Sequence, residues 1–259
     1  MPLAPGFAAL LALALSMPAP SAEFDSCTTP RPPEPDSIQT IQLTRRDPSG
    51  GQSVASANLY GERSRSGAIR LLVRPTRPED LRGTFLSFTL REDETVIFFG
   101  SPELRAPKRI RGVDELGSLF GSDFSFADFA SVQGLASPMT KRRLPDTRVA
   151  DRDVFVVELK PVDPAKSPYT RIVASVDRIS CLPLRSEMYA EGKLRKVQTI
   201  DPAHVIHSRS VDRYLPERIV LEDRRDGTST TLDLVSADFE VSRASAIFGP
   251  QGATEPDGD

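Results

Sequence analysis

The sequence predicts a mainly β protein, in which a long antiparallel sheet is interrupted once by short apolar helices. Apolar and polar residues alternate with period two on both sides of the interruption, as they do in strands with one buried face. Between residue 113 and about residue 134, the apolar residues recur at helical spacing instead. Turn-forming residues separate the alternating runs, so we expect strands that are neighbours in sequence to pair.

Four alternating runs precede the interruption. They span residues 54–63, 68–74, 84–90 and 95–99. Within the second run, Ile69, Leu71 and Val73 point to one face of the strand, whereas Arg70 and Arg74 point to the other. One face of the sheet is therefore expected to be apolar and buried away from water. The preceding stretch, residues 37–46, fits two interpretations, because it can be a strand or an amphipathic helical turn capped by Asp36.

The alternation resumes after residue 150. The runs span residues 155–159, 172–176, 182–189, 193–200, 205–211, 218–222 and 228–235. Gly192 and the pair Asp226-Gly227 supply hairpin turns between them. The pattern alone does not fix the register of these strands, so it leaves open which face would line a cavity.

The helical interruption contains the densest aromatic stretch of the chain, FGSDFSFADF at residues 120–129, with four phenylalanines and two aspartates. Ser125 and Asp128 have the spacing of a capping box, and Gly134 is a plausible helix stop. Asp123 and Asp128 also fit a carboxylate pair for acid–base chemistry. Cap and turn roles are favoured, because aspartate is stabilised near helix N-termini.

Composition limits the classes of function. The chain has 259 residues, which is enough to bury one sizeable core, and we expect a single domain over residues 36–248. Its 36 acidic and 33 basic residues nearly cancel. No field of one sign is available to bind a phosphate backbone, so nucleic acid is not an expected partner.

The two ends of the chain are expected to lie outside the folded domain. Residues 1–22 are interpreted as a secretory signal peptide cleaved near Ser21 or Ala22, because the apolar run 7–17 is too short to span a bilayer. The basic residues usual at the start of a signal peptide are missing, and a buried N-terminal helix is the alternative. We interpret residues 23–35 as a proline-rich linker and residues 249–259 as a disordered acidic tail.

The chain has two cysteines, Cys27 and Cys181. In an oxidising compartment they are expected to form a disulfide bond between the N-terminal segment and the strand region around residue 181. The alternative is a pair of independent buried thiols.

We find no motif that points to catalysis, a cofactor or a metal. The two histidines, His204 and His207, would point to opposite faces of a strand, which is poor geometry for a shared metal ion. No nucleophile motif lies beside them. Two basic clusters, residues 108–111 and 141–143, are interpreted as solvated strand ends, with contact to anionic lipid headgroups or an acidic partner as the alternative.

Several motifs occur in an order that resembles the larger LolA-like outer-membrane lipoprotein-sorting proteins. They are LRGTFL at 81–86, PELR at 102–105, KRI at 108–110, GSDFSFAD at 121–128, SPY at 167–169, PLR at 183–185 and GKL at 192–194. The resemblance covers about residues 27–248, and its most specific element is the aromatic stretch.

The resemblance implies an incomplete antiparallel β-barrel with a helical lid, enclosing an apolar cavity for acyl chains. It further implies a non-enzymatic periplasmic carrier of lipid or lipoprotein acyl chains, with an inner-membrane transporter or an outer-membrane acceptor as possible partners. The expected lid and cavity residues are Leu116, Leu119, Phe120, Phe124, Phe126, Phe129, Phe85 and Phe88. The alternative is an accessory subunit of an RND-type export machine without its own lipid cargo.

Overall fold

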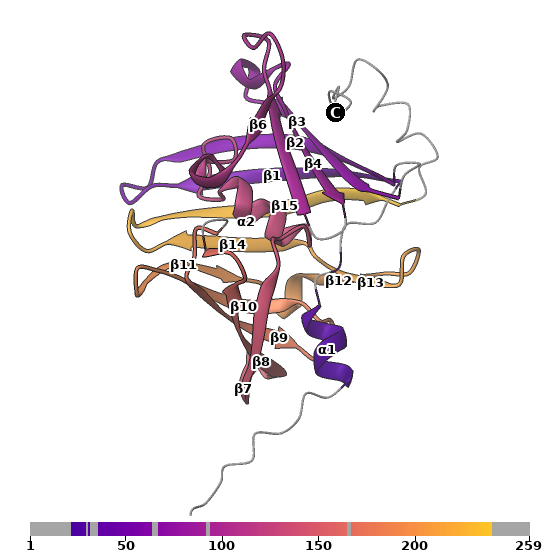
Figure 1. Ribbon diagram of the computed structural model, residues 1–259, viewed down its shortest axis with the longest axis vertical. Coiled ribbons are helices and arrows are strands. Elements are labelled where there is room, and N and C mark those ends of the chain that lie inside the picture. Colours follow the sequence, from indigo (N-terminus) through magenta and orange to yellow (C-terminus); the bar gives the residue numbers. More distant parts are fainter. Residues whose placement is uncertain are drawn as a thin grey trace, which may run out of the picture.

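A computed structural model of the chain describes residues 22–29, 31, 36–63, 67–91, 94–164 and 167–239 (Figure 1). Nearly all of the interpreted signal peptide and the whole acidic tail lie outside these residues. None of the helices in the described part is long and apolar enough to cross a membrane.

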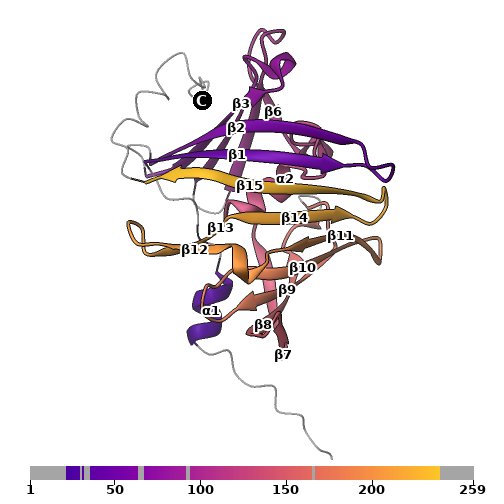
Figure 2. The same cartoon turned by 180° about the vertical axis from the view of Figure 1, so that it is seen from behind.

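One antiparallel sheet of 13 strands forms the body of the protein (Figures 1 and 2). Its strand order is β6-β5-β4-β3-β2-β1-β15-β14-β11-β10-β9-β8-β7. The sheet is curved but not closed, because β6 and β7 each have one sheet neighbour in the described structure. This is the incomplete barrel that the sequence predicted.

The strands are bounded as follows. They are β1 (Ser37–Arg46), β2 (Gln52–Arg63), β3 (Ile69–Arg77), β4 (Phe85–Arg91), β5 (Glu94–Gly100), β6 (Lys108–Ile110), β7 (Met139–Val149), β8 (Arg152–Pro161), β9 (Arg171–Asp177), β10 (Pro183–Ala190), β11 (Lys193–Thr199), β14 (Arg218–Asp223) and β15 (Thr228–Asp238). A separate two-stranded sheet pairs β12 (Val205–Ser208) with β13 (Arg213–Pro216).

The helices are short. They are α1 (Ala22–Thr28), α2 (Phe126–Val132) and the 3-10 turns η1 (Glu79–Leu81), η2 (Gly112–Leu116) and η4 (Pro202–His204). Helix α2 lies against the concave side of the sheet, in front of it in Figure 1 and behind it in Figure 2. It belongs to the predicted helical interruption, which links β6 to β7.

The register settles which strand residues face the concave side in the first half of the sheet. Leu71 pairs with Phe88, and Phe88 pairs with Ile97, so these three side chains share one face. All three are buried in the main core together with residues of the lid. Phe85 pairs with Gly100 and has the opposite orientation, because side chains alternate along a strand.

Three local expectations need correction or a choice. Residues 37–46 form strand β1, not a helical turn. Helix α1 (Ala22–Thr28) begins at the last residue of the interpreted signal peptide and takes up the first part of the interpreted linker, and its Phe24 ring packs edge-on against Phe155 with the ring centres 5.6 Å apart. The basic cluster 141–143 lies inside strand β7, which the sequence did not predict, because an exposed edge strand has no apolar alternation to reveal it.

Candidate functional site

Helix α2 begins at a complete capping box. The Ser125 Oγ atom accepts a hydrogen bond from the Asp128 backbone N–H at 3.1 Å, and Asp128 Oδ2 accepts one from the Ser125 N–H at 2.9 Å. This arrangement satisfies two backbone donors that a helix start would otherwise leave unpaired. The capping role predicted for Ser125 and Asp128 is confirmed.

Asp123 connects the turn before α2 to the central strands β1 and β15 through hydrogen bonds. Its carboxylate accepts hydrogen bonds from the hydroxyls of Thr228 and Thr230 on β15, at 2.6 and 2.7 Å. Arg45 Nε on β1 donates a third, at 3.3 Å. The carboxylates of Asp123 and Asp128 therefore bind separate sets of partners, and the arrangement is not a carboxylate pair sharing a proton.

Asp128 joins α2 to the second half of the sheet. Besides the capping box, it accepts a hydrogen bond from the Tyr169 hydroxyl and one from Lys196 Nζ on β11, each at 2.6 Å. Lys196 Nζ also donates to the Asp123 carbonyl oxygen at 2.6 Å. Burial, and then the negative charge of Asp128, raise the pKa of Tyr169 well above its usual value. The phenol therefore stays protonated and remains a donor. We call Asp128, Tyr169 and Lys196 the latch.

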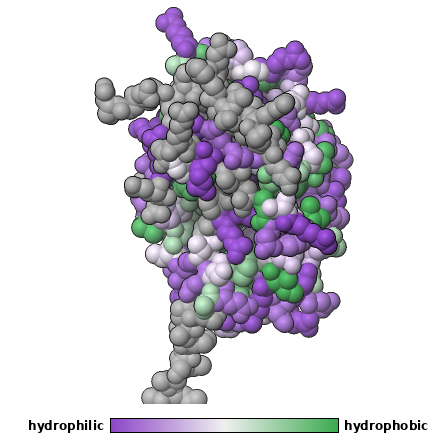
Figure 3. Space-filling model, turned by 90° about the vertical axis from the view of Figure 1, so that its right-hand side faces the viewer, coloured by the Kyte–Doolittle hydropathy of each residue, from purple (hydrophilic) through white to green (hydrophobic). Residues whose placement is uncertain are grey.

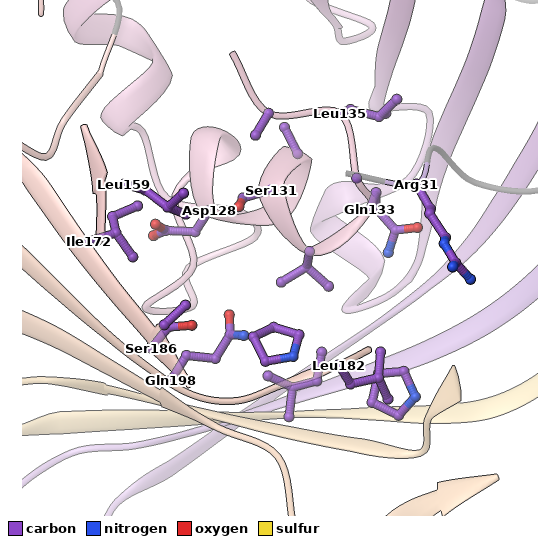
Figure 4. A pocket seen from close by; sticks show the side chains of 18 of the residues that line it. Arg31, Asp128, Ser131, Gln133, Leu135, Leu159, Ile172, Leu182, Ser186 and Gln198 are labelled. Carbon is purple, nitrogen blue, oxygen red and sulfur yellow. The ribbon is translucent and has the colours of Figure 1, made fainter. Parts of the chain in front are cut away.

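The helix α2 has two different faces. On one face, Phe129 is fully buried and its ring lies 5.8 Å from that of Phe88 on β4. On the other face, the small residues Ala127, Ala130 and Ser131 border an open space (Figure 4). The large side chains of the helix thus fill the core, and its small side chains form the wall of a cavity.

The cavity has a volume of about 700 Å³ and lies between α2 and the concave face of the sheet (Figure 4). Small-molecule sites usually measure about 300–1,000 Å³. Most of its floor is apolar and comes from β8, β9, β10, β14 and β15 and from Ile200, which follows β11. The apolar floor residues are Val157, Leu159, Ile172, Ala174, Val176, Met188, Ile200, Ile219, Leu232 and Leu234.

One end of the cavity is bordered by the segment that follows α1. The disulfide bond between Cys27 and Cys181 lies there, as the cysteine count led us to expect, and Arg31 also lines this end. Lys141 on β7 holds the end of α1, because its Nζ atom donates to the Thr28 carbonyl oxygen at 3.4 Å. The disulfide and this contact connect the N-terminal segment to the second half of the sheet.

The eight residues expected to bind a ligand do not line this cavity. Leu119, Phe124 and Phe129 are fully buried in the core with Phe88, and Phe120 and Phe126 pack against that core. Leu116 is exposed, and Phe85 faces away from the concave side. The packing of the buried residues has a simple physical reason, because large apolar side chains gain most by filling space and leave none open.

Two sequence signals mark the lining residues that were missed. The small residues of α2 recur at 127, 130 and 131, on the side of the helix that lacks phenylalanine. Ile172, Ala174 and Val176 follow the period of two on β9, and all three line the cavity. Both signals become informative only once the helix is placed over the strands.

The other candidate groups have local partners. Lys108 pairs with Asp114 at 3.0 Å and Arg109 with Glu94 at 3.1 Å. In the second basic cluster, Arg142 pairs with Glu158 at 2.9 Å, and the Arg143 guanidinium lies over the Phe24 ring at 5.3 Å. Lys108 is solvated, as predicted, but the second cluster lies inside β7 and its Arg143 is largely covered, with 18% of its side chain exposed.

The histidines lie outside the cavity lining. The His207 Nε2 atom lies 3.0 Å from the Asp212 carboxylate on the small β12–β13 sheet. Within the described residues, no group of three or more histidine, cysteine, aspartate or glutamate side chains is arranged to hold a metal ion. On the face in Figure 3, the visible apolar side chains form small separate groups among hydrophilic ones.

Comparisons with known proteins agree on the fold. A family model with the description "Uncharacterized protein" matches residues 67–252. No curated protein matches the chain. A solved DUF1329 family protein from Desulfovibrio piger is 19% identical to this chain and superimposes with a TM-score of 0.75. The match covers 89% of this chain and 94% of that protein.

Two further structures have the same fold. A protein from Vibrio parahaemolyticus described as an outer membrane lipoprotein-sorting domain is 23% identical, with a TM-score of 0.71, covering 84% of this chain and 90% of its own. A LolA superfamily protein from Nitrosomonas europaea is 16% identical, with a TM-score of 0.61, covering 84% and 92%. The chain therefore has a LolA-like fold, as its sequence motifs indicated.

Proposed function

The chain belongs to the family whose model matches residues 67–252, and from its LolA-like fold and its cavity we propose that it is a non-enzymatic periplasmic lipid carrier. Its cargo is an acyl chain, carried by a lipoprotein or by another lipid. The observation that carries this proposal is the apolar cavity of about 700 Å³ between α2 and the sheet.

The energetics of acyl transfer favour a protein with this kind of cavity. An acyl chain in water is unfavourable by about 0.8 kcal/mol for each methylene group, so a long chain leaves a membrane slowly without help. An apolar cavity replaces the bilayer with comparable surroundings, which makes transfer from membrane to protein close to balanced. The Ile172 and Leu159 side chains that point into the cavity in Figure 4 supply such surroundings.

Two features support an exported protein. The Cys27–Cys181 disulfide bond is the kind of bond that persists in an oxidising compartment, such as the periplasm. The N-terminal segment has the length and apolar run of a secretory signal peptide.

A pair of adjacent substitutions tests the cavity directly. Ile172 and Val173 are neighbours on β9 and both are half-buried, but Ile172 lines the cavity and Val173 points to the opposite face. We expect Ile172→Trp to weaken binding of a fluorescent acyl probe at least about tenfold, because the indole occupies space that the chain needs. Val173→Trp is the matched control and should bind the probe as the natural protein does.

Lipid extraction from the natively purified protein provides a second measurement. Stoichiometric acyl species in the mass spectrum are expected from the natural protein, and reduced amounts from Ile172→Trp. Equal loading of the two tryptophan variants would contradict the proposal. A reproducibly empty protein that co-purifies with a membrane complex would favour the accessory-subunit role instead.

A further inference from the structure

Two polar side chains lie together on the otherwise apolar floor of the cavity. Ser186 on β10 and Gln198 on β11 are direct cross-strand partners, so their side chains share the concave face. Only 6% of Ser186 and 7% of Gln198 is exposed. Figure 4 shows the two side chains next to each other beneath α2, between Ile172 on one side and Leu182 on the other.

Neither side chain has a hydrogen-bond partner within the described part of the chain. Two other polar groups at the cavity do have partners, since the Tyr169 hydroxyl donates to Asp128 and the Thr95 hydroxyl donates to the Leu135 carbonyl oxygen, each at 2.6 Å. Both side chains line the cavity, so the Ser186 hydroxyl and the Gln198 amide are free to bond to a molecule that enters it.

The surroundings indicate the chemistry of that partner. The residues that pair with these two side chains on the neighbouring strands are apolar. Ala174 on β9 pairs with Ser186, and Leu221 on β14 pairs with Gln198. The cation nearest along β11, Lys196, is already bonded to Asp128 and to the Asp123 carbonyl oxygen. The lining cation labelled in Figure 4, Arg31, lies apart from Ser186 and Gln198, so a charged ligand group held at this pair would have no opposite charge beside it, and burying it there would be unfavourable.

A neutral carbonyl group fits the pair. The amide N–H of Gln198 and the O–H of Ser186 are both donors, and a carbonyl oxygen accepts two hydrogen bonds. From this geometry we infer that Ser186 and Gln198 form a specificity site that binds the uncharged carbonyl of an acyl ester or amide. This inference rests on the proposed carrier function and goes further, because it selects acylated groups over free fatty acids and plain hydrocarbon.

The test compares three probes of similar chain length: methyl dodecanoate, tetradecane and dodecanoate. Each probe displaces a neutral fluorescent dye, N-phenyl-naphthylamine, from the full-length protein. We expect Gln198→Leu to weaken binding of methyl dodecanoate by about 5- to 10-fold, and Ser186→Ala by about 3- to 5-fold, which are losses typical of one neutral hydrogen bond. Binding of tetradecane should be unchanged or tighter in both variants.

The matched control is Gln42→Leu, because Gln42 lies half-buried on β1 and does not line the cavity. This variant should keep the natural preference for ester over alkane. The inference is overturned if Gln198→Leu binds ester and alkane in the same ratio as the natural protein, or if the natural protein prefers dodecanoate to its methyl ester. Failure of the natural protein to bind any probe would overturn the carrier function itself, which is a distinct result.

Discussion

The two halves of the sheet bury their concave faces in different ways. In the first half, Leu71 on β3 and Phe88 on β4 are buried in one core with the lid residues Leu119, Phe124 and Phe129, all of them fully buried. Strands β8 to β11 face a cavity instead, across which lie the small residues of α2. The same short helix therefore packs closely on the first half and borders open space over the second, although Ile41, Leu90 and Ile97 of the first half also line the cavity. Aromatic content marked the filled region, and the four phenylalanines of residues 120–129 do not line the cavity.

The largest expected effect comes from truncating a leucine in the filled half. Leu119→Ala should lower the free energy of unfolding by about 3–5 kcal/mol, because it leaves a cavity in a close-packed core. The matched variant Leu159→Ala, on the cavity floor, should lower it by only about 1–2 kcal/mol, since Leu159 already borders open space. Denaturant unfolding monitored by circular dichroism measures both.

The same pair of variants distinguishes the halves by ligand binding. Folded Leu119→Ala should bind the acyl probe normally, whereas Leu159→Ala should change its affinity. Equal losses of stability in the two variants would remove the distinction between a filled half and an open half.

A smaller effect is expected from removing the disulfide bond that holds α1 to the second half. The double variant Cys27→Ala with Cys181→Ala should lose about 2–4 kcal/mol of stability, the typical value for a structural disulfide. Proteolysis should then begin near α1, which remains attached through Phe24 and Lys141. An undiminished unfolding midpoint in the double variant would show that α1 does not stabilise this half.

The smallest expected effect concerns the latch. Tyr169→Phe should lower stability at neutral pH by about 1.5 kcal/mol, because it removes one hydrogen bond to a charged group. Since folding raises the pKa of Tyr169, its contribution is fully present below pH 10 and is lost as the pH rises through the folded value. Above pH 10, the stability of the natural protein should therefore fall more steeply than that of the variant.

Tyrosinate absorbance provides the corresponding titration. The natural protein has four tyrosines, and the last of them to ionise should be missing from the Tyr169→Phe titration. If the two curves end at the same pH, Tyr169 is not held protonated by burial beside Asp128.

Local features of the sequence predicted most of the fold. Period-two alternation located the strands of both halves, and the spacing of Ser125 and Asp128 predicted the capping box that the structure contains. Strand β7 and helix α1 were missed, because an exposed edge strand and a short helix held by a disulfide have little periodic signal.

The cavity could not be located in this way, because it depends on contacts between distant residues. Asp128 binds Tyr169 and Lys196, which lie 41 and 68 residues further along the chain. These contacts fix the side of α2 that meets each strand. Phenylalanine content predicts burial but does not distinguish a filled core from a cavity wall.

The connection between the two sheet edges has a mechanical consequence. Strand β6 ends at Ile110 and β7 begins at Met139, so the chain between the free edges is the segment that carries α2. The two edge strands of the half-barrel, β6 and β7, are therefore connected by the segment that covers its concave side. The latch holds this segment to the sheet at Asp128, near the middle of the segment. If β6 and β7 moved apart, only the two short stretches of chain on either side of Asp128 could extend. We therefore expect the distance between the two edges and the position of α2 to change together.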